Sequence, residues 1–396
     1  MTADQLAALR TPAGRAALDT ATALIRAGAD PLTASSALRR HDIPAPLATA
    51  ALTQAALRVR AEPKFGPDAA VMFFTRTGLE QATRAVVADR RAARLAAGGA
   101  STLVDLGCGV GSDSIATARA GLQVTAVESD PDTAAVAAAN LVALGLTARA
   151  RVVCADATQF DLRGFDAVFC DPARRSATGR RTFDPASFSP PWSFVVDLPR
   201  RVRHAVLKLA PGLDHSLIPA GAEAEWVSVS GALVEATLWF GPLAETPRRA
   251  TLLAAGHQAA ELTGDGTRRA PVGPLRRYLY DPDPAVVRAG LVAEFAATIA
   301  GNLADPEIAY VYAEAAHRSR YGRCLEVLEA LPFSLKRLRA AVRAAGAGRL
   351  EIMKRGSPLE PEWLRRQLRC TGDRPLTVVL TRVANAPTAL LCQPTS

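Results

Sequence analysis

A glycine-rich stretch at residues 104–111, VDLGCGVG, constrains this chain more than any other feature. An apolar run typical of a β-strand precedes it, and a helical pattern of small residues follows at 112–120. Gly107, Gly109 and Gly111 let the backbone turn sharply and lie against a ligand, because no Cβ stands in the way. A strand, a glycine turn and a helix in this order predict the first unit of a nucleotide-binding α/β domain.

The spacing of these glycines argues against two kinds of ligand site. A dinucleotide fingerprint needs glycine or alanine at position 112, where this chain has Ser112. A triphosphate-binding loop needs a lysine after its glycines, and none follows here. The turn therefore indicates a nucleotide-like ligand of another class.

Strands and helices alternate from residue 101 to about residue 209, which requires a parallel sheet with right-handed crossovers. A further pair of alternating strands follows, with Gly231 at its turn. We predict a Rossmann-like α/β fold whose sheet has seven strands. The expected strands cover 101–105, 123–127, 150–154, 165–170, 204–209, 225–230 and 234–240.

Acidic residues stand at or just beyond the carboxyl ends of the first four expected strands, where open α/β sheets bind their ligands. Glu128 follows Asp105 by 23 residues and is placed to accept hydrogen bonds from ribose hydroxyls, with a helix cap as the alternative. Asp156 can accept from an adenine amino group or serve as an ordinary turn residue. We expect Asp105 to order the glycine turn.

The 396 residues are too many for one compact domain, so we expect several parts. Periodicity predicts helices at the N-terminus, a ribbon of strands at 249–270 and a mostly helical stretch at 275–330. The last part reads as a small α/β module. The predicted parts are an N-terminal helical segment at 1–60, a ligand-binding domain at 61–245, a ribbon and helical connecting region at 246–332 and the terminal module at 333–396.

Positive charge is concentrated at the end of the chain. The net charge is +9, and residues 333–396 contain 12 lysines and arginines against 4 aspartates and glutamates. A basic module of this kind predicts contact with nucleic acid, with a solvated basic surface as the alternative. The chain has only four lysines among its 47 basic residues, so its preference for arginine reflects composition and not phosphate geometry.

Several classes of protein are not indicated. No apolar run approaches the length of a membrane span, and the N-terminal residues lack the apolar core of a signal peptide. The six cysteines form no CxxC pair and no zinc spacing with the five histidines. We expect a cytoplasmic protein that holds neither a metal ion nor a disulfide.

Six motifs together resemble the bacterial class I S-adenosylmethionine (SAM) methyltransferases that have a C-terminal THUMP-like domain. The resemblance implies the seven-stranded sheet of that class, SAM as the cofactor, and contact of Asp105 with the methionine amino group. It also implies an RNA substrate, because THUMP-type modules accompany tRNA and rRNA modification. The motifs are VDLGCGVGSD at 104–113, AVESDP at 126–131, CDPARR at 170–175, YLYDPDPAVVRAGL at 278–291, LEIMKRG at 350–356 and LTVVLTRV at 376–383.

The resemblance also points to a catalytic turn. Asp171, Pro172, Arg174 and Arg175 occupy the position of the (Asp/Asn)-Pro-Pro-(aromatic) motif of nucleic-acid amino methyltransferases. A carboxylate and a carbonyl group held by proline can orient an amine and receive developing positive charge. This chain departs from the motif because it has no second proline and replaces the aromatic residue with arginine, which can hold phosphate or form salt bridges.

The missing aromatic platform could come from Phe183, Phe188 or Trp192 in the following loop. Gln81 and Thr83, on the helix before the glycine turn, could reach the cofactor or belong to an ordinary helix surface. Two other functions remain open. One is a methyltransferase that acts on a small molecule or a protein, and the other is a module that binds SAM or RNA without catalysis.

Overall fold

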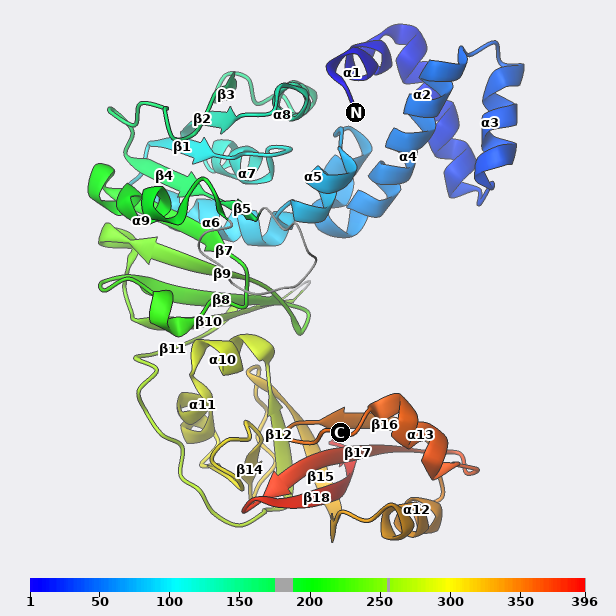
Figure 1. Cartoon of the computed structure of the whole chain (residues 1–396), viewed down its shortest axis with the longest axis vertical. Helices are drawn as coiled ribbons and strands as arrows, with labels where there is room; N and C mark the ends of the chain where they lie inside the picture. The colour runs from blue at the N-terminus through cyan, green and yellow to red at the C-terminus, as the bar shows by residue number, and fades with distance from the viewer. Residues whose placement is uncertain (175–187, 255–256, 396) are drawn as a thin grey trace. The chain divides into compact units, whose positions relative to one another are not determined.

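The computed structural model describes residues 1–174, 188–254 and 257–395 (Figure 1). The chain forms two compact units. The first consists of Met1–Ala222 and Thr237–Glu245, and the second of Glu223–Ala236 and Thr246–Ser396.

The first unit begins with helices, as the periodicity predicts. Short polar residues cap them: Thr2 accepts a hydrogen bond from the Gln5 amide at 3.2 Å, and Thr11 accepts from the Gly14 amide at 3.0 Å. The single helix expected around Gln81 and Thr83 is divided in two, because α5 ends at Gln81 and α6 begins at Ala85. The helices are α1 (Ala3–Arg10), α2 (Pro12–Arg26), α3 (Pro31–Arg40), α4 (Ala45–Phe65), η1 (Gly66–Ala70), α5 (Arg76–Gln81) and α6 (Ala85–Ala97).

A parallel sheet follows in the first unit, with the strand order β7-β4-β1-β2-β3. Strands β1, β2, β4 and β7 are mainly apolar and buried, and the edge strand β3 is partly exposed. Helices α7 and α8 pack on β1 to β3, and α9 packs on β7. This arrangement confirms the predicted Rossmann-like α/β fold. The elements are β1 (Thr102–Leu106), α7 (Ser112–Arg119), β2 (Gln123–Glu128), α8 (Pro131–Ala143), β3 (Ala150–Cys154), β4 (Ala167–Cys170), β5 (Ala173–Arg174), β6 (Phe188–Ser189), α9 (Trp192–Arg201), β7 (His204–Leu209) and η3 (His215–Leu217).

The complete sheet has the order β11-β10-β8-β9-β7-β4-β1-β2-β3 among the described residues. The seven positions from β3 to β8 correspond to the seven expected strands. The ribbon expected at 249–270 adds two more, because β10 pairs with β8 in parallel and β11 pairs with β10 in the antiparallel sense. These strands are β8 (Glu223–Val229), β9 (Ala232–Phe240, followed by η4 at Gly241–Leu243), β10 (Arg248–Leu253) and β11 (Ala260–Gly264).

The prediction that residues 275–330 are mostly helical is wrong. The stretch has two short helices, and its short strands pair with partners far away in the chain, such as β12 with β14 and β15. Such strands depend on tertiary pairing, which local periodicity does not reveal. The elements are β12 (Tyr278–Pro282), α10 (Pro284–Ala289), α11 (Val292–Thr298), β13 (Asn302–Leu303), β14 (Val311–Ala313) and β15 (Gly322–Pro332).

The helices and strands expected in the terminal module are confirmed. The strands of the module belong to a second sheet (Figure 1), whose order is β13-β14-β12-β15-β18-β17-β16. Helices α12 and α13 both contact β16. Among the described residues, no helix combines the length and the apolar composition that crossing a membrane requires. The elements are α12 (Leu335–Ala344), β16 (Ala347–Lys354), α13 (Pro361–Leu368), β17 (Arg374–Val383) and β18 (Ala386–Pro394).

A buried amide on α8 ties an N-terminal segment to the glycine turn. The Asn140 side chain is fully buried and accepts from the Phe73 amide at 2.7 Å. It also donates to the Phe73 carbonyl at 3.0 Å and to the Val110 carbonyl at 2.9 Å. One side chain therefore satisfies three buried backbone groups, two in the segment before α5 and one in the turn.

We predict that Asn140→Leu destabilises the protein by about 2–5 kcal/mol, because it leaves buried backbone groups unpaired at nearly constant side-chain volume. Urea unfolding measures the change in the free energy of unfolding. The matched control is Gln159→Leu, at an exposed amide, which should change that free energy by less than about 0.5 kcal/mol. Equal effects of the two substitutions would contradict the role of Asn140.

Candidate active site

The glycine turn between β1 and α7 is built from left-handed backbone. The φ angles are 84° at Gly107, 57° at Gly109 and 90° at Gly111, where residues with a Cβ are strained. The amides of Gly107 and Cys108 donate to the Val127 carbonyl at 2.9 and 3.1 Å. The turn is thereby fixed to the carboxyl end of β2.

The turn leaves room for a ligand. A Cβ added to Gly109 would meet no atom within 4 Å, and one added to Gly107 would meet only the Asp171 carbonyl oxygen at 3.6 Å. The backbone at this turn therefore borders open space. Gly111 ends the turn as the N-cap of α7.

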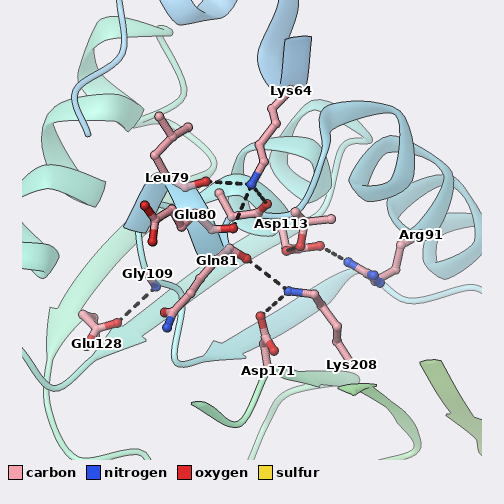
Figure 2. A network of polar contacts seen from close by, with 12 residues as sticks. Lys64, Leu79, Glu80, Gln81, Arg91, Gly109, Asp113, Glu128, Asp171 and Lys208 are labelled. Carbon is pink, nitrogen blue, oxygen red and sulfur yellow. Dashed lines mark hydrogen bonds and ion pairs between the residues drawn. The ribbon is translucent and has the colours of Figure 1, made fainter. Parts of the chain in front are cut away.

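Glu128 lies beside the turn at the end of β2. Its Oε2 accepts a hydrogen bond from the Gly109 amide at 3.1 Å (Figure 2). Its Oε1 accepts from the Asp130 amide at 3.0 Å. The side chain is half-buried, and each carboxylate oxygen can accept a second bond. The residue expected to bind ribose thus stands next to the open side of the glycine turn, and its contact with ribose stays a prediction.

Asp105 lies beneath the turn and is fully buried. One of its oxygens accepts from the Ser114 hydroxyl at 2.5 Å, and the other has no hydrogen-bond partner among the described residues. Burial, reinforced by the charge of Asp113, raises the pKa of Asp105 to about 8. Its hydrogen bond with Ser114 joins the end of β1 to α7 across the glycine turn, as expected of a residue that orders this turn.

Asp156 is exposed in the loop after β3. Its Oδ1 accepts from the Thr158 amide and from the Thr158 hydroxyl, both at 2.8 Å, and these bonds lower the pKa of Asp156. The carboxylate thus forms a local turn just after β3, the edge strand of the sheet. Its contact with adenine remains a prediction.

Asp171 follows β4 and forms an ion pair with Lys208, near the end of β7 (Figure 2). The Lys208 ammonium also lies 3.5 Å from the Gln81 carbonyl oxygen at the end of α5. Because the Asp171 backbone borders Gly107, the structure brings the expected catalytic turn against the expected cofactor turn. Lys208 was not among the site residues predicted from the sequence.

The rest of the expected catalytic turn is described in part. Pro172 is buried, and the backbone of Arg174 belongs to β5, where it pairs with Phe188 of β6. Arg175 lies outside the described residues.

Of the three aromatic residues proposed as a platform, Phe183 also lies outside the described residues. The rings of Phe188 and Trp192 are 5.7 Å apart. Trp192 and Phe194 of α9 line a groove of about 710 Å³, together with Asp197, Arg200 and residues near η3.

A second lysine missed by the sequence analysis joins α4 to the chain just before α6. Lys64 donates to the carbonyl oxygens of Leu79, Glu80 and Ala82 at 2.7, 2.9 and 3.1 Å. Burial lowers the pKa of Lys64 to about 8, and the nearby positive charge of Lys208 adds to this effect. Two of the four lysines in this arginine-rich chain therefore lie at the site. The rarity of lysine in the sequence is a signal that could have pointed to these two residues.

A buried ion pair holds the segment around Gln81 and Thr83 in place. The Thr83 hydroxyl donates to Asp113 at 2.7 Å, and Arg91 of α6 pairs with the same carboxylate on α7. Thr83 therefore braces the helix that follows the glycine turn. The Gln81 side chain is exposed, and its contact with a cofactor remains a prediction. Among the described residues, no group of three or more His, Cys, Asp or Glu side chains is arranged to hold a metal ion.

Three sequence families match parts of the chain. The family described as a methyltransferase domain matches residues 103–178, and the family described as THUMP domain-like matches residues 322–394. A domain of unknown function matches residues 2–61.

Known proteins match the chain over different lengths. An uncharacterized S-adenosylmethionine-dependent methyltransferase of Mycobacterium tuberculosis is 37% identical over 352 residues, covering 85% of this chain and 95% of that protein. A 23S rRNA (uracil(1939)-C(5))-methyltransferase of Acidithiobacillus ferrooxidans is 36% identical over 107 residues, covering 26% of this chain and 24% of that protein. A crystal structure of a proposed methyltransferase from Porphyromonas gingivalis W83 covers 90% of this chain and 92% of that one, with a TM-score of 0.72 at 22% identity.

We predict that Asp105→Asn flattens the dependence of stability on pH. In the unfolded chain this carboxyl ionises near pH 4, whereas in the folded protein it keeps its proton up to about pH 8. The stability contribution of the wild-type carboxyl is therefore present below about pH 4 and is lost as the pH rises towards 8. The asparagine has no proton to lose, so the stability of the variant relative to wild type should rise between pH 5.5 and about pH 8.5.

Urea unfolding at several values of pH measures this difference. Asp156→Asn is the control, because the pKa of Asp156 is lowered and this carboxylate stays ionised throughout that range. Parallel stability curves for wild type and Asp105→Asn would contradict the prediction.

Proposed function

The chain belongs to the S-adenosylmethionine-dependent methyltransferases, with a THUMP-like domain at its C-terminus, and from this premise we propose that its methyl acceptor is structured RNA. The observation that carries the proposal is the charge of residues 333–396, with 12 basic residues against 4 acidic ones. Arginine and lysine neutralise backbone phosphates and release counterions, which gives affinity for nucleic acid without sequence information.

SAM is the cofactor of this family, and it supplies a methyl group that is already activated on a sulfonium. The protein therefore has mainly to bind the cofactor and align an acceptor. We assign cofactor binding to Glu128 and to the glycine turn, on the open side of Gly109. Asp105 lies beneath the turn and orders it, and Asp156 follows β3, the strand that pairs with β2.

The acceptor side of the site is formed by Asp171 and Pro172, next to the glycine turn. Lys208 neutralises the Asp171 carboxylate and links it to the end of α5 through Gln81. We propose that Asp171 and the carbonyl group before the proline orient the acceptor, and that Arg174 and Arg175 meet phosphate groups of the RNA.

Similarity to a known RNA enzyme supports the same substrate class. The 107 residues that match the 23S rRNA methyltransferase make up 26% of this chain. A tRNA or an rRNA is therefore the acceptor that we would test first.

The proposal predicts methyl transfer from labelled SAM to RNA extracted from a strain that lacks the gene, and little transfer to RNA from its parent, which is already modified. Asp171→Ala should reduce transfer at least about a hundredfold while SAM binding stays within a few-fold of wild type, because the substitution acts on the acceptor side. Mass spectrometry of nucleosides from the two strains identifies the modified base. Lys208→Met should also slow transfer, since it leaves the carboxylate without its cation.

The outcomes separate the competing functions. SAM binding with transfer to a protein or metabolite fraction, and none to RNA, would replace the RNA proposal with the second methyltransferase hypothesis. SAM binding without transfer to any fraction would favour a non-catalytic module.

We further predict that Glu128→Ala weakens SAM binding about 10–100-fold, because a hydrogen bond to a charged acceptor contributes roughly 1.5–3 kcal/mol. Isothermal titration calorimetry measures the affinity without relying on activity. Glu128→Gln keeps one oxygen for the backbone amides and should have a smaller effect. The control is Glu62→Ala, on α4, and unchanged affinity in the Glu128 variants would contradict the ribose role.

A further inference from the structure

The terminal module has a groove lined mainly by arginine. Its volume is about 600 Å³, and its walls come from β16 and from the C-terminal end of α13. Arg349, Arg365, Arg366 and Arg369 contribute to the lining, and no aspartate or glutamate does. Four guanidinium groups around one hollow repel one another unless an anion is bound.

Few of these charges are compensated within the module. The side chains of Arg349, Arg366 and Arg369 form no hydrogen bond or ion pair with another described residue, and all three residues are exposed. Arg365 donates to the Leu350 carbonyl and lies 3.6 Å from Glu362.

Two of the four acidic residues of the module pair with cations outside this groove. Glu351 pairs with Arg323 at 2.5 Å, and Glu360 pairs with Lys354 at 2.7 Å. Glu362 offsets one of the four arginine charges, and the groove keeps an excess of positive charge from the other three.

The backbone is irregular at two of the arginines that line the groove. Arg369 has φ 47° and ψ 58° at the C-terminal end of α13, a left-handed position where glycine is the usual residue. The register of β16 against β17 shifts between Ala347 and Arg349, so Gly348 is an extra residue immediately before Arg349. Such bulges redirect side chains, and a strained residue that local rules disfavour indicates a functional constraint.

We propose that this groove is a phosphate-binding site that holds the backbone of the RNA substrate. The inference rests on the proposed function and names the part of the basic module that makes the contact. Planar guanidinium groups bind phosphate oxygens in pairs, and four of them around a groove match consecutive phosphodiesters better than a small anion. The contact is independent of base sequence.

The test compares two variants of the full chain that lose the same charge. The first carries Arg349→Gln, Arg366→Gln and Arg369→Gln in the groove, and the second carries Arg39→Gln, Arg40→Gln and Arg268→Gln at other exposed arginines. The probe is a fluorescent 30-nucleotide RNA hairpin, and anisotropy gives its affinity at several salt concentrations. The groove variant should bind at least about tenfold more weakly, and its salt dependence should fall by about two to three ions.

The charge-matched control should lose less than about threefold in affinity. Equal losses in the two variants would show a general charge effect and overturn the groove. If wild type binds and methylates RNA while the groove variant binds it equally well, only the groove proposal fails. If wild type neither binds nor methylates RNA, the proposed substrate fails instead.

Arg369→Gly separates a binding role from a structural one. Glycine relieves the left-handed backbone, so the melting temperature should stay the same or rise, while RNA affinity falls about two- to fivefold. A lower melting temperature with unchanged RNA affinity would assign Arg369 to the fold and contradict its part in the groove.

Discussion

The attachment of the glycine turn to the end of β2 is the constraint on which the site depends. Two amides of the turn donate to the Val127 carbonyl, and a third, at Gly109, donates to Glu128. Regular helix or strand backbone could not bring these amides to the end of β2, because the chain has left-handed backbone at Gly107 and Gly111. The bonds place the residue assigned to ribose within hydrogen-bonding distance of the turn, so the position of Glu128 follows from backbone geometry.

The elements around the turn are joined by buried polar side chains rather than by apolar packing alone. Asn140 holds the segment before α5 to the turn, and Asp113 receives both Thr83 and Arg91. Buried polar groups are costly unless every one is paired, so such links specify one arrangement more sharply than apolar contacts do. The segment before α5, Thr83 and helix α6 are thereby joined to the glycine turn and to the helix that follows it.

The sequence was most informative where local chemistry decides the structure. Glycine spacing and acidic residues at strand ends predicted the α/β fold, and the quoted motifs predicted the methyltransferase family, which the comparisons confirm. Lys64 and Lys208 were missed because their partners are backbone carbonyls and a carboxylate brought together only by folding. The strands between residues 275 and 330 were missed for the same reason, because β12 is stabilised by long-range pairing and not by its own pattern.

Burial, together with the distribution of charge at the site, explains why one carboxyl keeps its proton. Asp113 has Arg91 as its cation, and Asp171 has Lys208. Asp105 is buried between these two acids without an ion pair among the described residues, so both of them raise its pKa. A carboxyl in this state is neutral at physiological pH and responds to any positive charge brought near it. The proton on Asp105 therefore keeps an unpaired negative charge out of the buried space beneath the glycine turn.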